Sequence, residues 1–250
     1  MIENIMVYQG SKNRLAKFLV PIIQKYISQN NIQMYIEPMV GGANIIDKIK
    51  CNNKLGSDIN DELISLLKYI QIDTQLSIAP PVCTFEHYSD VRENRKLKTN
   101  KYSKEYIALI GFCASYGGRY FDGGYGRNSK GGRSIYNERL ENLKKQAQNL
   151  LDIEFKNCDY KEYKDYKNNL FYFDPPYKDT KRYLNYSIDY NEFYNFIREL
   201  SKNNIVLVSE YDMPDDFTCI WEKETLTNLD SKRGDDKDRK LRVERLFTLN

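Results

Sequence analysis

The stretch that decides the fold is Leu170-Phe171-Tyr172-Phe173-Asp174-Pro175-Pro176-Tyr177, an apolar run that ends in an acidic residue, two prolines and a tyrosine. Such a run predicts a strand buried on both faces, and ligands of open α/β sheets bind beyond the carboxyl ends of such strands. Pro175 and Pro176 lack N–H donors but keep their carbonyls, so the loop suits an amine substrate, and the ring of Tyr177 can stack on a planar base. A rigid turn without function is the alternative, and the preceding strand favours function.

Strand and helix patterns alternate on both sides of this motif, which predicts a doubly wound α/β sheet. The last two expected strands can form an antiparallel pair, and Pro21 is expected to kink or interrupt the first helix. The expected strands cover residues 34–36, 54–57, 153–155, 170–173, 205–208, 219–221 and 243–247, and the expected helices cover 11–29, 43–49, 62–70, 105–114, 137–150 and 190–200.

The alternation is interrupted from residue 72 onward by a basic segment. Between Arg92 and Lys145 there are 13 basic and five acidic residues, a local charge of +8, whereas the rest of the chain carries −5. We therefore expect a discontinuous catalytic domain, residues 1–71 and 152–250, with an inserted subdomain at 72–151. A basic insert on an acidic body indicates a surface that faces phosphates, although a solvated face of basic helices explains it equally well.

Composition excludes several classes of site. The chain has no run of about 18 apolar residues, so we expect no membrane span. Its five cysteines are far apart and form no C-x-x-C pair, which predicts neither a metal site nor a disulfide framework. The single histidine, His87, leaves no Ser-His or Cys-His pair unless it serves itself.

Three further motifs lie where a nucleoside-like ligand of such a sheet would bind. The first is Glu37-Pro38-Met39-Val40-Gly41-Gly42-Ala43-Asn44, which follows a strand. Its glycines allow close approach of a ligand to the backbone, and the acidic residue before them suits a ligand with an ammonium group; the alternative is an ordinary tight turn. This motif is neither G-x-G-x-x-G nor a P-loop. Asp58 ends the next strand, where it can bind a ribose diol or cap a helix. Tyr8-Gln9-Gly10-Ser11-Lys12 can hold a carboxylate, or Ser11 can cap the first helix.

In this order, the motifs resemble the Dam-type class of adenine amino-methyltransferases of bacteria and their phages. That family has an aromatic-x-G-x-K segment, an E-P-F-x-G-x-G-like loop, an acidic residue after the second strand, a DNA-reading insert and D-P-P-Y. The match runs from Tyr8 to the segment 209–214, which, like 117–127, looks like phage-encoded members. Met39 replaces the usual aromatic residue and Ala43 the last glycine, and the insert lacks the R-Y-N…F-N-V-P-F-G pattern of GATC-modifying relatives.

The resemblance implies a Rossmann-like S-adenosylmethionine-dependent methyltransferase sheet with an inserted DNA-recognition subdomain. By resemblance, Tyr8, Lys12 and Glu37, with the backbone near them, hold the methionine end of S-adenosylmethionine. Asp58 holds its ribose, and Asp159 and Tyr160 border its adenine. The implied cofactor-binding residues are Tyr8, Lys12, Glu37, Pro38, Met39, Gly41, Asp58, Asp159, Tyr160 and Asp174.

The resemblance also implies that duplex DNA is the partner and that its target adenine flips out of the helix. Asp174 and the Pro175 carbonyl would then accept from the adenine amine, while Tyr177 stacks on the base, so the implied catalytic residues are Asp174, Pro175, Pro176 and Tyr177. Tyr120, with Phe121 and Tyr125, either contacts bases or forms a local hydrophobic cluster. The implied DNA-binding residues are Arg119, Tyr120, Arg127, Lys130 and Arg133. We expect a monomer in the cytoplasm of a bacterial host.

Three alternatives remain open at this stage. D-P-P-Y chemistry serves any exposed planar amine, so an RNA adenine methyltransferase is the nearest alternative. A non-catalytic DNA-binding relative is a second, against which the intact Asp174–Tyr177 run argues. A protein-glutamine methyltransferase is a third, but such enzymes usually carry Asn at the first position of this motif.

Overall fold

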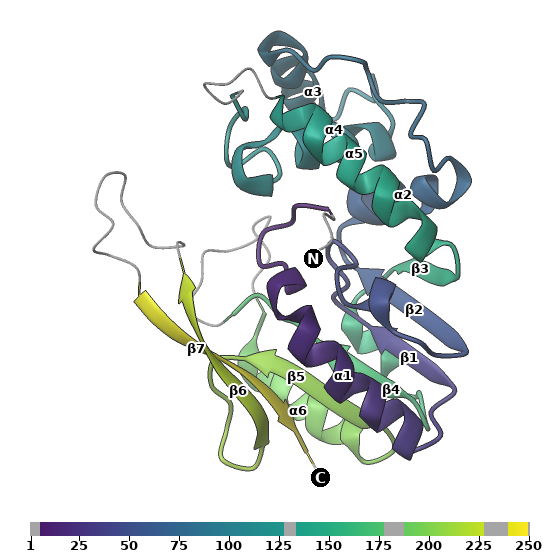
Figure 1. The fold of residues 1–250 in the computed structure, drawn as a ribbon, viewed down its shortest axis with the longest axis vertical. Helices are drawn as coiled ribbons and strands as arrows, with labels where there is room; N and C mark the ends of the chain where they lie inside the picture. Colours follow the sequence, from purple (N-terminus) through teal and green to yellow (C-terminus); the bar gives the residue numbers. More distant parts are fainter. Residues whose placement is uncertain (1–5, 128–133, 178–187, 228–239, 250) are drawn as a thin grey trace. The chain divides into compact units, whose positions relative to one another are not determined.

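The computed structural model describes residues 6–127, 134–177, 188–227 and 240–249 (Figure 1). The chain divides into two compact units, residues 1–160 and 161–250, and each is described by itself. The predicted insert, 72–151, lies inside the first unit, and its boundaries remain a prediction.

The first unit contains three parallel strands in the order β3-β2-β1. These are β1 (Met34–Glu37), β2 (Asn53–Asp58) and β3 (Ile153–Asn157). Glu37 is paired with Gly56, and Asp58 with Asn157, so the three strands end at one edge. Tyr35, Ile36, Leu55 and Phe155 are buried, as expected of parallel strands covered on both faces.

Two helices of this unit belong to the predicted catalytic part. In α1 (Asn13–Gln29), Leu15, Leu19, Ile23 and Ile27 recur every four residues and form its buried face. The helix continues past Pro21, so this residue does not interrupt it. The helix α2 (Asp61–Ile72) begins after Asn60, whose side chain accepts from the backbone N–H of Leu63.

The predicted insert is helical. It contains α3 (Phe85–Leu97), α4 (Lys104–Ala114) and α5 (Ile135–Ala147), with 3₁₀ turns η2 (Tyr116–Gly118) and η3 (Gln148–Leu150). All residues from Ile107 to Ala114 are buried, so α4 is the centre of this helical group. Up to Arg127, the segment after α4 is a loop that contains η2 and one β-bridge between Ser115 and Tyr125.

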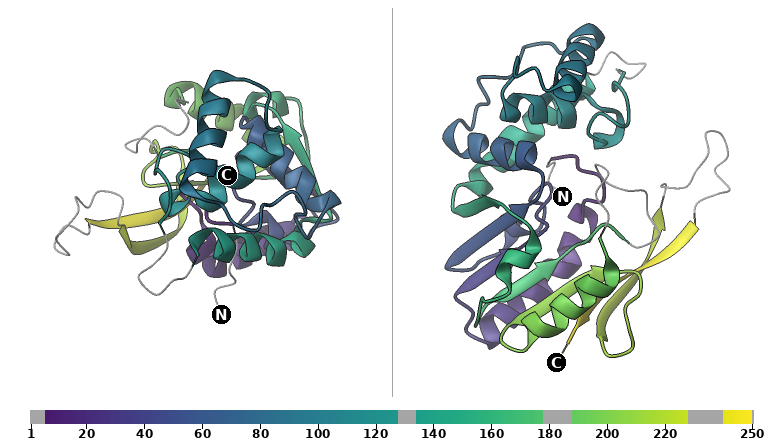
Figure 2. Two further views of the ribbon diagram at one scale, coloured as in Figure 1. Left: turned by 90° about the horizontal axis from the view of Figure 1, so that it is seen from above. Right: turned by 180° about the vertical axis from the view of Figure 1, so that it is seen from behind.

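The second unit contains four strands in the order β4-β5-β7-β6. They are β4 (Leu170–Phe173), β5 (Ile205–Glu210), β6 (Thr218–Thr227) and β7 (Lys240–Thr248). β4 and β5 are parallel, and β7 is antiparallel to β5 and β6, which confirms the predicted final pair. The helix α6 (Tyr190–Ser201) covers one face of β4 and β5 (Figure 2). The 3₁₀ turn η4 (Tyr160–Tyr163) spans the boundary between the units.

The fold is mixed α/β and Rossmann-like, as predicted, and every predicted strand is present. The helix predicted at 43–49 is wrong. The segment is a turn, with Gly41 and Ala43 at φ +48° and +56°, followed by a short 3₁₀ helix, η1 (Ile46–Lys48). Two left-handed residues so close together stop an α-helix from starting there. The helix α3 had not been predicted.

Candidate active site

The glycine-containing loop after β1, residues 38–45, packs tightly against the N-terminal segment. Gly41 has φ +48°, and a Cβ atom added to it would lie 2.9 Å from Cε1 of Tyr8. The ring of Tyr8 also packs on Phe112, with 5.5 Å between the ring centroids. Glycine is therefore required at position 41 both for its backbone conformation and for the space that Tyr8 occupies. We call residues 38–45, which the sequence predicts to bind the cofactor, the cofactor loop from here on.

Asp58 joins the end of β2 to the cofactor loop. Its Oδ2 accepts from the backbone N–H of Gly41 at 3.2 Å, and its Oδ1 accepts from the N–H of Asn60 at 2.9 Å. Burial raises the pKa of Asp58 from 3.8 to about 6, although these N–H groups oppose the rise. The alternative prediction that Asp58 caps the next helix is corrected, because Asn60 occupies the N-cap.

Asn60 supplies the observation that tests whether this edge suits a nucleoside-like cofactor. Its Oδ1 caps α2, whereas its Nδ2 is buried and has no hydrogen-bond partner among the described residues. A buried donor of this kind costs free energy unless a ligand or water satisfies it. A carboxylate that accepts and an amide that donates, two residues apart, suit a ribose diol, so these residues fit the cofactor that the sequence predicts.

The other predicted cofactor residues of the first unit lie at the strand ends or at the start of α1. Lys12 is buried at the N-cap of α1, with Nζ 3.4 Å from the Gly10 carbonyl. Glu37 is 3% exposed and accepts from the hydroxyl of Tyr35 at 2.6 Å. Pro38 is buried, Met39 and Asp159 are half-buried, and Tyr160 is buried. The structure thus brings Tyr8, Gly41 and Asp58 into one contact set.

In the second unit, Asp174-Pro175-Pro176-Tyr177 follows β4 as predicted. Tyr177 is 7% exposed, and its hydroxyl donates to Oε2 of Glu244, in β7, at 2.7 Å. Its ring meets the ring of Tyr211 edge to face at 4.3 Å. Burial raises the pKa of Tyr177, and the charges of Asp174 and Glu244 add to the rise. The hydroxyl of Tyr190 donates to the Pro176 carbonyl. The second half of the motif, Pro176 and Tyr177, is therefore held by residues of other elements.

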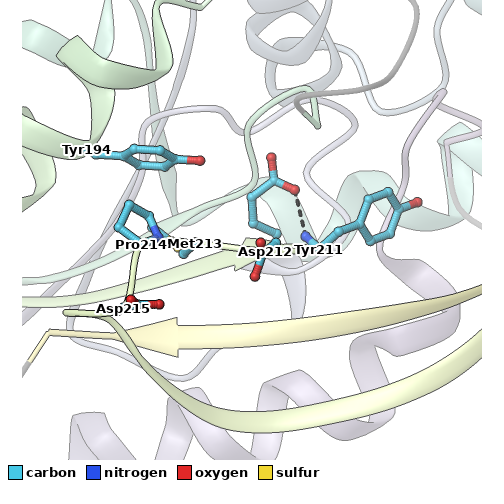
Figure 3. Close-up of a pocket in the computed structure, with 7 residues that line it drawn as sticks. Tyr194, Tyr211, Asp212, Met213, Pro214 and Asp215 are labelled. Atoms are coloured by element: carbon cyan, nitrogen blue, oxygen red, sulfur yellow. Dashed lines mark hydrogen bonds between the residues drawn. The ribbon is translucent and has the colours of Figure 1, made fainter.

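A cavity of about 590 Å³ opens beside the carboxyl end of β5 (Figure 3). Since Phe173 is paired with Val208, β5 is the direct neighbour of the strand that carries the motif. Glu210, 1% exposed, accepts from the N–H of Tyr211 at 2.6 Å. The cavity is lined by Tyr194, Glu210, Tyr211, Asp212, Met213, Pro214 and Asp215. Aromatic rings with buried and exposed carboxylates suit a planar ligand that donates hydrogens.

The predicted DNA-binding residues other than Tyr120 are four basic residues. Arg127 is exposed and Arg119 is half-buried, both in the loop after α4, whereas Lys130 and Arg133 lie outside the described residues.

Tyr120 requires a correction. It is 1% exposed and stacks on Phe112 at 4.4 Å, with its hydroxyl bonded to the carboxylate of Glu62. The guanidinium of Arg95 lies 4.9 Å from its ring centroid. Phe121 is also buried. The local hydrophobic cluster, the alternative at the sequence level, is what the structure shows, and Tyr120 has no surface from which to contact bases here.

Within the described ranges, no group of three or more His, Cys, Asp and Glu side chains is arranged to hold a metal ion. None of the helices there has the length and apolar character needed to cross a membrane.

The chain belongs to the D12 class N6 adenine-specific DNA methyltransferase family, whose model matches residues 8–233. It is thus a transferase that methylates adenine in DNA at N6.

The chain is also similar to a curated protein and to solved structures. The chain is 23% identical over 269 residues to the Type II methyltransferase M.MjaIII of Methanocaldococcus jannaschii, covering 93% of this chain and 92% of that one. Among solved structures, it is similar to a putative methylase from Haemophilus influenzae (TM-score 0.38, 13% identity, 95% of this chain and 89% of that one). A second is a putative methyltransferase from Escherichia coli (TM-score 0.36, 8% identity, 95% and 85%).

Sequence reasoning missed several residues at these two edges. Asn60 follows Asp58 by two positions, and its place before a helix was the available signal. Asn157 donates to the Asp58 carbonyl at 2.9 Å and ties β3 to the end of β2. Tyr194 and Glu244 carry no local signal, because each reaches the site from an element far away in sequence.

Proposed function

We propose that the chain transfers a methyl group from S-adenosylmethionine to the N6 amine of an adenine that is flipped out of duplex DNA. The observation that carries the cofactor assignment is the pair formed by Asp58 and the buried amide of Asn60 at the end of β2. When bound, S-adenosylmethionine supplies an electrophilic methyl group on a sulfonium centre.

The first unit binds and orients the cofactor. Asp58 accepts from the ribose hydroxyls, and the Nδ2 of Asn60 donates to one of their oxygens. Gly41 lets the cofactor approach the backbone, and Tyr8 closes the loop against it. Lys12 and Glu37 hold the carboxylate and the ammonium of the methionine end, with Pro38 and Met39 beside them. Asp159 and Tyr160 border the adenine of the cofactor.

The second unit binds the amine. Asp174 and the Pro175 carbonyl accept the two hydrogens of the adenine amine, which aims the lone pair of the nitrogen at the methyl group. The rigid Pro175-Pro176 backbone keeps these acceptors in place, and the ring of Tyr177 stacks on the base. Acceptors placed where positive charge develops on the nitrogen stabilise the transition state, and Asp174 takes the proton or passes it to water.

The cavity beside β5 is proposed to hold a part of the flipped nucleotide next to the reacting amine, because Tyr211, which lines it, contacts Tyr177. Its volume of about 590 Å³ lies within the roughly 300–1,000 Å³ of small-molecule sites. Extrusion of a base costs a few kcal/mol, which stacking in an aromatic pocket offsets. Arg119, Arg127, Lys130 and Arg133 are proposed to contact phosphates or guanines. We further propose that the protein acts as a monomer in the cytoplasm of a bacterial host, as one of the phage-encoded members.

The test is transfer of tritium from labelled S-adenosylmethionine to unmethylated duplex DNA, followed by digestion and chromatography of the product. Wild type should yield N6-methyladenine. Asp174→Asn should lose at least about 100-fold in kcat, the usual loss when one such electrostatic contact is removed. The matched control, Asp165→Asn, changes an exposed acid of the same unit and should keep wild-type activity.

Three results would contradict the proposal. Transfer to RNA duplexes of the same sequence in preference to DNA would assign the amine to RNA. Undiminished activity of Asp174→Asn would remove the motif from the chemistry. No binding of S-adenosylmethionine by calorimetry, with or without DNA, would remove the cofactor assignment.

A further inference from the structure

A buried glutamine on α5 holds the cofactor loop from behind. Gln146 is 2% exposed and lies in the last turn of the helix. Its Nε2 donates to the Gly42 carbonyl at 3.0 Å. The same nitrogen lies 3.4 Å from the Ala43 carbonyl, 3.4 Å from Oδ1 of Asn44 and 3.3 Å from Oδ2 of Asp47. One amide thus faces four acceptors of the loop and the turn that follows.

The other atom of the same amide holds the N-terminal segment. Oε1 of Gln146 accepts from the backbone N–H of Met6 at 3.0 Å. A donor on one side and acceptors on the other fix the orientation of the amide. Asn44 adds a parallel link, since its Nδ2 lies 3.3 Å from the Met6 carbonyl and 2.5 Å from Oγ of Ser11. The segment that carries Tyr8 is therefore fastened to the loop at the level of the backbone.

The same face of α5 also binds the start of the loop predicted to read DNA. Arg139 precedes Gln146 by seven residues, which is two helical turns. Its Nη1 lies 3.3 Å from the carbonyls of both Phe112 and Cys113, and it also donates to the Ser115 carbonyl. The helix α5 thus contacts both the cofactor loop and the C-terminal end of α4, where the loop predicted to read DNA begins.

We infer that Gln146 is a positioning residue for the methyl transfer, through which the insert holds the cofactor loop in its binding shape. The inference rests on the proposed function, because it takes that loop to be the S-adenosylmethionine site. The loop contains two left-handed residues, Gly41 and Ala43, and such a backbone persists only when its surroundings hold it. Gln146 stabilises this backbone conformation from a position outside the proposed ligand site.

The decisive variant is Gln146→Met, which keeps the shape of the side chain and removes its hydrogen bonds. The dissociation constant and the KM for S-adenosylmethionine should rise at least tenfold, while kcat at saturating cofactor stays within about twofold, because the reacting groups are untouched. In the cofactor-free protein, the backbone amides of residues 40–45 should exchange hydrogen faster than in wild type.

Gln71→Met is the matched control. Gln71 donates through Nε2 to the carbonyls of Leu150 and Ile153, both at 2.7 Å, so the same substitution breaks comparable bonds away from the cofactor loop. It should lower the melting temperature and leave the KM for S-adenosylmethionine unchanged.

Gln146→Glu adds a test of the donor itself. The carboxylate would still accept from Met6 but would face the Gly42 carbonyl and Asp47, so affinity should fall at pH 8. Protonation restores a donor, so the ratio of variant to wild-type affinity should recover as the pH falls toward 6.

Two results would overturn the inference: wild-type affinity and wild-type exchange in Gln146→Met, or an equal loss of affinity in Gln71→Met. A wild type that does not bind S-adenosylmethionine would refute the proposed function instead, and the exchange experiment would still decide whether Gln146 holds the loop.

Discussion

Acidification should weaken the binding of S-adenosylmethionine through Asp58. In the proposed site, the carboxylate form is the one that would accept from two ribose hydroxyls while it keeps its hydrogen bonds from the N–H groups of Gly41 and Asn60. With a pKa of about 6, this form makes up about nine tenths of the protein at pH 7 and about one tenth at pH 5. The affinity should therefore fall about tenfold between these two values, which corresponds to about 1.4 kcal/mol.

The stability of the cofactor-free protein should respond in the opposite direction. Since burial raises the pKa of Asp58 above its ordinary value of 3.8, its contribution to stability is largest at low pH and is lost as the pH rises through about 6. Binding favours the ionised form and folding favours the neutral one, so the two pH dependences separate the role in binding from a general loss of structure.

Calorimetric titration at constant ionic strength measures the binding effect. Between pH 5 and 7 the α-amino group of the cofactor stays protonated, so it does not interfere. Asp58→Asn should bind more weakly than wild type at pH 7 and show a flat profile. Its melting temperature should change little: loss of the buried charge favours folding by about 3 kcal/mol, and an amide that cannot accept from both N–H groups costs about 1–3 kcal/mol. A wild-type affinity that does not fall from pH 7 to 5, or an equal fall in Asp58→Asn, would refute this reasoning.

Three further substitutions test the geometry of the two loops. Gly41→Ala should weaken cofactor binding at least tenfold by calorimetry, because the new Cβ displaces the ring of Tyr8. Gly124→Ala is its control, because Gly124 also has a positive φ but lies in open space. This control should lower the free energy of unfolding by about 1–2 kcal/mol and leave the affinity for the cofactor unchanged. Ala43→Gly should raise the free energy of unfolding by about 0.5–1 kcal/mol in denaturant titrations, since it relieves a left-handed alanine at φ +56°. Tyr177→Phe removes the hydrogen bond to Glu244, so kcat should fall several-fold and the free energy of unfolding by about 1–2 kcal/mol. The affinity for the cofactor should stay at the wild-type value. An unchanged kcat would show that this hydrogen bond has no part in catalysis.

Strands and their end motifs could be predicted from the sequence because a buried strand leaves a short apolar run with a sharp polar end. The run 170–173 before Asp174 is the clearest case. The helix predicted at 43–49 was wrong, because such a pattern does not report the backbone conformation. Ile45, Ile46 and Ile49 are buried as in a helix, but the backbone before them is left-handed. The apolar residues there are buried, but the sequence did not predict the backbone conformation.

Features that depend on distant partners could not be predicted. The helix α3 has two buried residues, Tyr88 and Val91, and its otherwise polar sequence gives a weak helical period. Tyr120 resembled an exposed loop aromatic, but its hydroxyl reaches Glu62, 58 positions earlier in the chain. The contacts of Gln146 with Gly42 join residues 104 positions apart. No local pattern encodes such pairs, because they are formed by packing.

The pairing of β2 with β3 has a consequence for the order in which the protein is made. Asn157 lies 99 residues after the Asp58 carbonyl to which it donates, and the whole predicted insert separates them. While the ribosome synthesises that insert, the edge of β2 that will receive β3 remains an unpaired template. Closure of so long a loop is entropically slow, so prior folding of α3, α4 and α5 would shorten the search. The insert would then act as an internal folding aid for the edge where β2 and β3 pair, and nascent chains that end inside the insert, before β3, should aggregate through β2.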